Sequence, residues 1–229
     1  MRIALVGYGN MGRVVEEVAA AKGVEVAERF TRQRPLRADS ELAGVTLVDF
    51  SAPEAVPETA RAAAALALPL VIGTTGWHDR LDEVRATIES SSAGAVRASN
   101  FSLGVNVFYR LAERAAKILS AVDGYDPFIQ DWHHRFKKDS PSGTALEIRR
   151  RMARHYGERK VPISCQRAGY VPSEHSVGFD SPADTIHLQH RARNRRGFAE
   201  GALLAARWIA GRRGFHDFQE VLDDVLPAD

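Results

Sequence analysis

Apolar positions in the first hundred residues recur at two alternating spacings. Short runs rich in valine, isoleucine and leucine are typical of buried strands, whereas the apolar residues between Val14 and Ala19 fall on one face of a helix. The pattern predicts strands over 2–8, 24–30, 45–50, 70–72 and 95–98, and helices over 11–22, 54–66 and 79–90. Strands that alternate with helices in this way form a parallel sheet with helices on both faces.

A different pattern follows residue 102. A long amphipathic helix is predicted over 103–122, and residues 185–192 alternate apolar and polar side chains as a half-buried antiparallel strand does. The remaining predicted elements are strands over 127–133, 163–167 and 176–179, and helices over 145–156 and 198–209. We therefore expect an α/β chain of two domains, in which the last helix returns to the first domain.

Bulk composition narrows the class of protein. The 229 residues are 45% hydrophobic and 26% charged, close to the averages of globular proteins. The formal net charge of +2 is too balanced to indicate a nucleic-acid or membrane partner. The single cysteine, Cys165, cannot form an internal disulfide, and we expect it to be a small, partly buried side chain. These features predict a cytoplasmic protein.

A complete G-x-G-x-x-G motif follows the first predicted strand and opens the first helix, as Gly7-Tyr8-Gly9-Asn10-Met11-Gly12. Gly7 permits a tight turn, Gly9 lets the backbone approach a pyrophosphate, and Gly12 allows the helix to lie close to the strand. The helix N-terminus presents free N–H groups to phosphates. We therefore predict a Rossmann-type dinucleotide-binding domain over 1–102 with 196–229, and an α+β substrate-binding and oligomerisation domain with an open mixed sheet over 103–195.

Further candidate cofactor residues stand where other strands of the first sheet end. Ser51 follows the third strand, and Gly73, Thr74 and Thr75 follow the fourth. Ligands of open α/β sheets bind outside these carboxyl ends. After the second strand the chain carries Arg32 rather than an acid, and an arginine there favours a 2′-phosphate. NADPH is the predicted preference, with NADH as the other possibility and Glu28 as the residue that could instead reach the ribose.

The densest polar cluster of the second domain lies between residues 131 and 144. His133 and His134 end a predicted strand and Lys137 follows, while Ser142-Gly143-Thr144 opens a helix. A helix N-terminus with these residue types can bind a carboxylate through N–H groups and hydroxyls. Zinc is the main rival chemistry, but one cysteine and no H-E-x-x-H motif weaken it, so no metal is predicted.

These motifs resemble the dihydrodipicolinate reductase family over nearly the whole chain. The resemblance is carried by the glycine turn, by residues 49–51, 73–76 and 99–106, and above all by the segment 133–145, with further similarity at 174–177 and 195–202. The resemblance implies that His133 is the proton donor and Lys137 the second catalytic residue. It assigns the cyclic dicarboxylate to His134, Ser142, Gly143, Thr144 and Arg195, and the neighbourhood of the nicotinamide to Ala98, Ser99, Asn100 and Phe101.

What the family resemblance implies for function is hydride transfer to a cyclic imine dicarboxylate, giving tetrahydrodipicolinate in lysine and diaminopimelate biosynthesis. It also implies a homo-oligomer, specifically a tetramer. This chain departs from the family in three places. Residues 32–45 are compressed, the stretch between Arg167 and Glu174 is shorter than usual, and Thr31 followed by Arg32 stands where the family often has an acid for the adenosine ribose.

Two other functions fit parts of the pattern. A related amino-acid dehydrogenase would share the architecture but would lack the pairing of His-His-x-x-Lys with Pro-Ser-Gly-Thr, which is present here. A dinucleotide sensor without catalysis could use the same fold, because fold does not determine function. Such a sensor would be expected to lose His133 or Lys137, and both are present.

Overall fold

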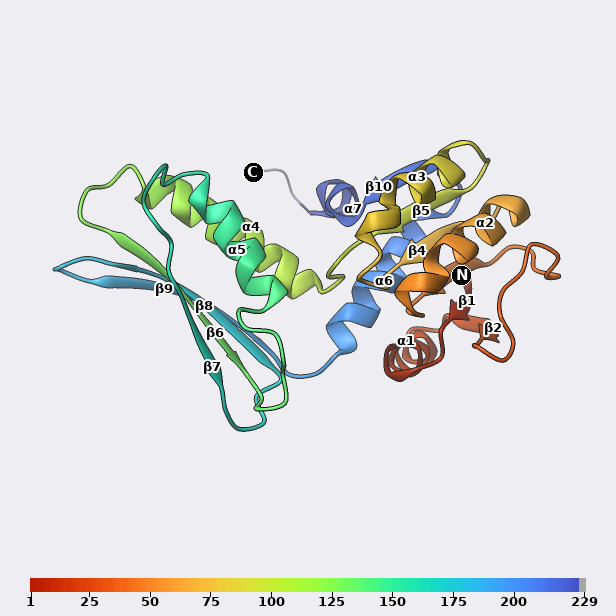
Figure 1. Ribbon diagram of the computed structural model, residues 1–229, viewed down its shortest axis with the longest axis horizontal. Coiled ribbons are helices and arrows are strands. Elements are labelled where there is room, and N and C mark those ends of the chain that lie inside the picture. Colours follow the sequence, from red (N-terminus) through yellow and green to blue (C-terminus); the bar gives the residue numbers. More distant parts are fainter. Residues whose placement is uncertain (227–229) are drawn as a thin grey trace. The chain divides into compact units, whose positions relative to one another are not determined.

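The computed structural model describes residues 1–226, and the chain divides into two compact units (Figure 1). Unit 1 holds Met1–Ser102 and the chain from Arg195 onward, and unit 2 holds Leu103–Asn194. The last three residues of the predicted range 196–229 lie outside the described residues. No helix within residues 1–226 combines the length and the apolar character that a membrane crossing needs.

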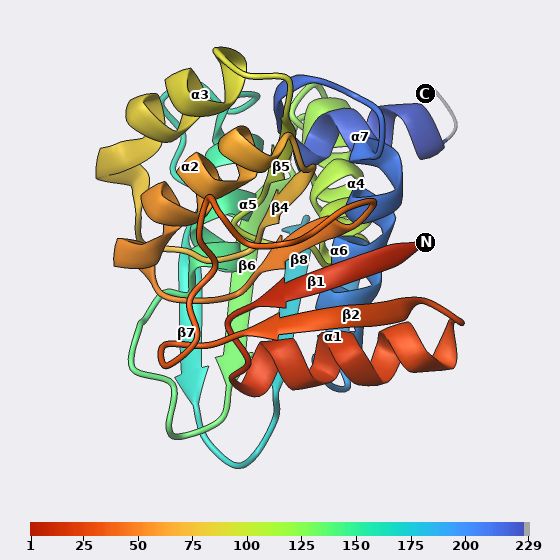
Figure 2. The same ribbon diagram turned by 90° about the vertical axis from the view of Figure 1, so that its right-hand side faces the viewer.

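Unit 1 is built on a six-stranded sheet in which all strands are parallel and stand in the order β10-β5-β4-β3-β1-β2. The strands are β1 (Arg2–Val6), β2 (Glu25–Phe30), β3 (Thr46–Asp49), β4 (Leu70–Ile72), β5 (Gly94–Arg97) and β10 (Gly214–Asp217). Figure 2 shows β1 and β2 side by side with α1 (Asn10–Ala21) next to β2. The central strands are fully buried because helices cover both faces of the sheet.

The helices of unit 1 form two packed pairs on opposite faces of this sheet. Helix α1 packs against α6 (Arg196–Ile209), and α2 (Val56–Leu66) packs against α3 (Leu81–Glu89) (Figures 1 and 2). Glycine lets α6 approach closely, since a Cβ on Gly201 would lie 1.7 Å from the carbonyl oxygen of Phe101. The short helices η1 (Pro53–Ala55) and η2 (His78–Arg80) precede α2 and α3, and α7 (Phe218–Val225) ends the described chain.

Unit 2 has a four-stranded mixed sheet with helices on one face only (Figure 1). The order is β7-β6-β8-β9, where β6 pairs parallel to β7 and antiparallel to β8, and β8 pairs antiparallel to β9. Helix α4 (Leu103–Leu119) and helix α5 (Gly143–Ala153) cover one face and enclose an apolar core around Ile129, Ile148 and Val177. The strands are β6 (Asp126–His133), β7 (Ile163–Arg167), β8 (Ser173–Asp180) and β9 (Thr185–Ala192).

The predicted fold class is confirmed, and the differences concern individual elements. Strand β8 is longer than the predicted 176–179, because its pairing with β6 and β9 continues over residues with no apolar alternation. Strand β10 and helix α7 were not predicted. The expected burial of Cys165 is wrong: it stands on the edge strand β7 and is exposed.

Candidate active site

The carboxyl ends of β1, β2 and β3 border a cavity of about 570 Å³ in unit 1, which we call the glycine crevice. The sheet order reverses here, because β2 and β3 flank β1 on opposite sides, and such a switch point is where doubly wound sheets bind ligands. Five residues of the predicted cofactor set line it, namely Gly7, Tyr8, Gly9, Arg32 and Ser51. Sequence reasoning missed Glu54 and Glu58, which also line it and stand before and within α2.

The glycine turn has the shape that a bound dinucleotide requires. Gly7 has a φ of +87°, and a Cβ there would lie 2.5 Å from the carbonyl oxygen of Phe50. A Cβ on Gly12 would lie 2.3 Å from the Gly7 carbonyl oxygen, whereas a Cβ on Gly9 would meet nothing within 4 Å. The open side of Gly9 and the start of α1 at Asn10 leave room for a pyrophosphate beside free helix N–H groups. The residues present therefore fit a dinucleotide.

Of the rest of the glycine motif, Asn10 is exposed, Met11 is half-buried, and Tyr8 is half-buried with its hydroxyl on the carboxylate of Glu16. The guanidinium of Arg13 also lies over the Tyr8 ring, 5.0 Å from its centroid. These contacts anchor the first helical turn to the loop that precedes it.

Glu28 near the end of β2, and Arg32 and Arg34 in the turn after it, have different partners. Arg34 forms a two-pronged ion pair with Glu28, at 2.7 and 3.1 Å. Arg32 lines the glycine crevice, is exposed, and has no ion-pair partner among the described residues. Glu28 is therefore paired with Arg34 and does not line the crevice. Arg32 does line the crevice, and its guanidinium can bind a ligand there.

Asp49 joins the ends of β3 and β4 beneath this crevice. Its side chain is fully buried; Oδ1 accepts hydrogen bonds from the Ser51 backbone N–H at 2.7 Å and from the Thr74 hydroxyl at 2.9 Å, while Oδ2 has no partner. Burial raises the pKa of the Asp49 carboxyl, and the hydrogen bonds from Ser51 and Thr74 offset this only in part. The Asp49 carboxyl therefore links the loops that follow β3 and β4, which both hold predicted cofactor residues.

We expect Asp49→Asn to stabilise the protein more at pH 8 than at pH 5. A carboxyl whose pKa is raised by folding stabilises the folded state below its unfolded pKa and loses that contribution as pH rises through its folded pKa. Asparagine keeps the oxygen that Ser51 and Thr74 need and never ionises. The gain at pH 8 should be about 1 to 3 kcal/mol, the usual cost of an uncompensated buried polar group.

Urea unfolding of the wild type and Asp49→Asn at the two pH values measures this effect. Asp79→Asn, at an exposed carboxylate of the same unit, serves as the control. An equal difference between wild type and Asp49→Asn at both pH values would contradict the assignment.

The loops after β4 and β5 hold the other predicted cofactor residues, none of which lines the glycine crevice. Thr74 is buried against Asp49, whereas Thr75 is exposed. Gly73 is required by packing, since a Cβ there would lie 2.2 Å from the ring of Phe50. In the segment after β5, Ala98 and Asn100 are half-buried and Ser99 is exposed. Phe101 is 1% exposed and packs its ring on Phe218, so only its backbone can face a ligand.

In unit 2 the predicted catalytic histidine, His133, contacts the buried carboxylate of Asp131. His133 ends β6, and its Nδ1 lies 2.8 Å from Oδ1 of Asp131, two residues earlier on the same face of the strand. The pairing of β6 with β8 brings His175 opposite Asp131, with Nε2 at 3.4 Å from the same oxygen. The other carboxylate oxygen accepts from Arg167 at 2.9 Å and from the Ser142 backbone N–H at 2.7 Å. We call these five residues the Asp131 cluster.

Two opposed effects set the charges in this cluster. Burial by itself raises the pKa of Asp131, but the close contacts with His133 and His175 and the hydrogen bonds from the Ser142 backbone and Arg167 outweigh it and hold that pKa well below its usual range. Burial lowers the pKa of His175, and the nearby carboxylate offsets this only in part. Asp131 is therefore ionised and His175 neutral at ordinary pH.

The other two predicted polar residues of this segment follow the end of β6. His134 is half-buried beside the ring of Phe136, and Lys137 directs its ammonium group to both carboxylate oxygens of Asp139, at 2.7 and 2.9 Å. The Lys137 ion pair holds the pKa of Asp139 below its usual range. A substrate carboxylate that reaches Lys137 must compete with Asp139.

The start of α5 provides the predicted anion site. Ser142 is the N-cap: it is 2% exposed, and its hydroxyl accepts from the Ala145 N–H and contacts Nε2 of His175. The backbone N–H groups of Gly143 and Thr144 have no acceptor among the described residues. The side chain of Thr144 hydrogen-bonds to Tyr109, whose hydroxyl pKa is raised by burial. Free N–H groups at a helix N-terminus are suited to a carboxylate.

The structure groups most of the predicted substrate residues but not all of them. His133, Ser142 and the start of α5 meet at the Asp131 cluster, and His134 and Lys137 adjoin it along the chain. Arg195 stands instead at the N-cap of α6 in unit 1, with an exposed side chain.

Asp131, His175 and Arg167 were not predicted as site residues. The sequence carried a weak signal for Asp131, two positions before a candidate acid, but nothing in it shows that β7 and β8 bring Arg167 and His175 to the same carboxylate.

A parallel sheet with a fitting dinucleotide turn, together with a second unit in which a histidine, a lysine and free helix N–H groups follow the end of one strand, is the architecture of a two-domain NAD(P)H-dependent oxidoreductase. The family models for the N-terminus and the C-terminus of dihydrodipicolinate reductase match residues 1–101 and 104–222. The chain belongs to the dihydrodipicolinate reductase family.

Relatives that carry a reductase name match nearly the whole chain. It is 32% identical over 237 residues to a 4-hydroxy-tetrahydrodipicolinate reductase of Christiangramia forsetii, with 99% of each chain covered. It is 35% identical over 261 residues to a 4-hydroxy-tetrahydrodipicolinate reductase of Archaeoglobus fulgidus, covering 97% of this chain and all of the relative (100%).

Solved structures support the fold. The dihydrodipicolinate reductase of Paenisporosarcina sp. TG-14 with dipicolinate bound has a TM-score of 0.79 at 20% identity, with 99% of each chain covered. The DAP dehydrogenase of C. glutamicum in complex with DAP is less similar, with a TM-score of 0.51 at 14% identity, covering 100% of this chain and 96% of that one.

Proposed function

We propose that this protein is a 4-hydroxy-tetrahydrodipicolinate reductase, which uses NAD(P)H to reduce a cyclic imine dicarboxylate to tetrahydrodipicolinate. The observation that carries the proposal is the arrangement of unit 2 at the end of β6. His133 there contacts the buried carboxylate of Asp131, and it is followed along the chain by Lys137 and then by the free N–H groups at the start of α5. Family membership over both units supports the same reaction.

Each residue of unit 2 has a distinct role in this proposal. A bound nicotinamide supplies the hydride. His133 donates the proton that completes the reduction, and Lys137 leaves Asp139 to neutralise a substrate carboxylate and assist that protonation. His134 and the N–H groups of Gly143 and Thr144 bind the dicarboxylate.

Two further residues of the predicted substrate set have separate roles. Ser142 holds the start of α5 in place, since its hydroxyl is already used within the protein. Arg195 contributes an exposed guanidinium for a second carboxylate.

The proposed cofactor residues lie in unit 1. Gly7 to Gly12 and the start of α1 hold the pyrophosphate, Ser51 and the loop Gly73-Thr74-Thr75 border the ribose and nicotinamide, and Ala98 to Phe101 approach the nicotinamide through their backbone. Arg32 selects NADPH over NADH. The fit of the glycine turn and the unpaired guanidinium in the crevice support these roles.

A coupled assay tests the reaction. Purified protein is mixed with NADPH or NADH and the product of the synthase that makes the imine dicarboxylate, and absorbance at the reduced-nicotinamide band is followed. We expect cofactor oxidation only when protein and imine are both present. Reduction of NADP⁺ or NAD⁺ when a diaminopimelate-type amino acid replaces the imine, which is the oxidative direction, would favour an amino-acid dehydrogenase instead.

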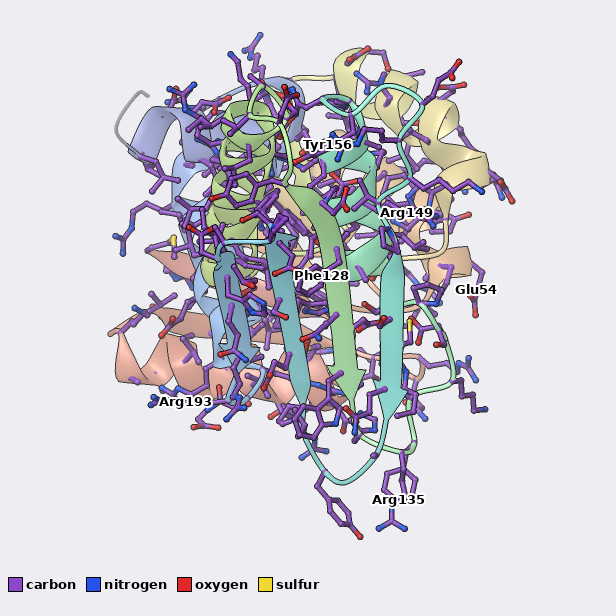
Figure 3. The ribbon with its side chains drawn as sticks, turned by 90° about the vertical axis from the view of Figure 1, so that its left-hand side faces the viewer. Glu54, Phe128, Arg135, Arg149, Tyr156 and Arg193 are labelled. Atoms are coloured by element: carbon purple, nitrogen blue, oxygen red, sulfur yellow. The ribbon has the colours of Figure 1, made fainter. Side chains whose placement is uncertain are left out.

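We also propose that the chain forms a homo-oligomer, a tetramer, through the face of the unit 2 sheet that neither α4 nor α5 covers. Figure 3 shows this face, with Phe128 on it. Phe128 and Trp132 stand on it half-buried, and the Phe128 ring packs on Gly178 and His187. A sheet face that carries half-buried aromatic side chains of this kind is suited to packing on a second copy.

Light scattering after size exclusion should return a mass near four times the 25.2 kDa of one chain. Phe128→Asp should lower that mass, because it places a charge at the centre of the uncovered face, whereas Arg149→Asp on the exposed side of α5 should not. A wild-type mass of one chain at micromolar concentration would contradict the assembly. We propose a cytoplasmic location as well, favoured by the single unpaired cysteine.

A further inference from the structure

A single buried carboxylate contacts both parts of the site at the end of β6. Oδ1 of Asp131 lies 2.8 Å from Nδ1 of His133, and Oδ2 accepts the Ser142 N–H at the start of α5 at 2.7 Å. We propose that Asp131 is a positioning residue, which holds His133 in one tautomer and fixes it relative to the anion site of α5. The inference rests on the proposed role of His133 as proton donor.

Few groups compensate the negative charge of Asp131. Its side chain is 0% exposed, and a buried charge must be compensated by its neighbours. His175 touches the same oxygen but is kept neutral by burial, which lowers its pKa. The negative charge therefore acts on Arg167, at 2.9 Å, and on the Nδ1 side of His133.

A permanent anion beside Nδ1 decides which ring nitrogen of His133 keeps its proton. The N–H at Nδ1 is directed off the line to Oδ1, so that the contact is a close electrostatic one rather than an aligned hydrogen bond. The attraction still favours a proton on Nδ1, and Nε2 has no partner among the described residues. When Nε2 gives its proton to the substrate, the imidazole that remains is the Nδ1–H tautomer.

The second oxygen links this acid to the substrate site. Ser142 caps α5 through its hydroxyl, while its own N–H is held by Asp131. The distance between His133 and the free N–H groups of Gly143 and Thr144 is thus set through one carboxylate. A shift of about 1 Å in such a distance is enough to cost a large part of the rate.

The same side chains could be read as a metal site, because ligand atoms of Asp131, His133 and His175 lie within 4.8 Å of one another. The positive charge of Arg167 favours the positioning role over a metal site. The guanidinium of Arg167 and the Ser142 N–H already occupy one carboxylate oxygen, and Nε2 of His175 is shared with the Ser142 hydroxyl at 3.0 Å. A divalent cation would have to enter beside the Arg167 charge.

Steady-state kinetics of Asp131→Asn test the positioning role. The donors Arg167 and Ser142 hold the amide oxygen, so the amide NH₂ faces His133 and forces the proton to Nε2 in the neutral ring. We expect kcat to fall by about 10- to 100-fold, as for loss of a correctly placed acid, with KM changed much less because the Ser142 N–H keeps its acceptor. Asp131→Glu should recover part of kcat. Asp126→Asn, an exposed carboxylate on the same strand, should match the wild type.

Nitrogen-15 spectra of labelled histidine supply a readout that needs no turnover. At a pH where His133 is neutral, its signal, assigned by its loss in His133→Ala, should show Nδ1–H in the wild type and Nε2–H in Asp131→Asn. An Nε2–H wild-type tautomer, or a folded Asp131→Asn with the kcat of Asp126→Asn, would overturn the inference. So would activity that EDTA abolishes and Zn²⁺ restores. If the wild type fails to reduce the imine, the proposed function fails, while the spectra still decide the tautomer.

Discussion

Alanine at His133 or at Lys137 is expected to lower kcat by about 10²-fold or more, the range for loss of a positioned acid, while the chain stays folded. His133 supplies the proton and Lys137 the positive charge that meets the substrate. Folding should survive because Asp131 keeps Arg167 and the Ser142 N–H as partners when the imidazole is removed. Lys137 is partly exposed, and within residues 1–226 its only ion pair is with the exposed Asp139.

The measurement is the initial rate of NADPH oxidation with the imine substrate, with circular dichroism to check folding. Lys138→Ala, at the exposed neighbouring lysine, serves as the control and should keep the wild-type rate. His134→Ala should mainly raise KM, because we assign it to substrate binding. Near-normal kcat in both His133→Ala and Lys137→Ala would remove the proposed chemistry from this site.

Wild-type protein is expected to prefer NADPH to NADH, and Arg32→Ala should lower kcat/KM for NADPH by about 10- to 100-fold, the equivalent of one lost hydrogen bond to a charged group. The guanidinium of Arg32 lies in the crevice lining without an ion-pair partner among the described residues. It can pair with the 2′-phosphate of NADPH, whereas NADH offers no anion there.

Arg34→Ala provides a matched control for this prediction. Arg34 lies on the same turn but is bound to Glu28 by two hydrogen bonds, at 3.1 and 2.7 Å. Arg34→Ala should leave the ratio of kcat/KM for the two cofactors nearly unchanged. Arg32→Ala should likewise keep the wild-type rate with NADH. A wild-type kcat/KM for NADH equal to that for NADPH, or an unchanged ratio in Arg32→Ala, would rule out the role of Arg32.

Much of the architecture could be predicted because local pattern and tertiary packing agree. Val15, Val18 and Ala19 face the core of unit 1 as their spacing indicated, and the glycine turn adopts the shape that its residues permit. Strand β10 was missed because Phe215 is its one apolar side chain, so it lacks the apolar run by which the still shorter β4 was predicted. Helix α7 was missed although Asp217 and Glu220 form a capping box that marks its start.

The sequence by itself determined which residue types stand at the ends of strands and helices, and hence the turn for a dinucleotide and the helix start for an anion. Only the tertiary structure decided which partners those residues have. His175 and Arg167 reach Asp131 because β8 and β7 flank β6, and this pairing depends on long-range strand register. Likewise, the ion pair of Arg34 with Glu28 leaves Arg32 as the available cation. Charges that are distant or equivalent in sequence acquire different roles because burial and pairing distinguish them.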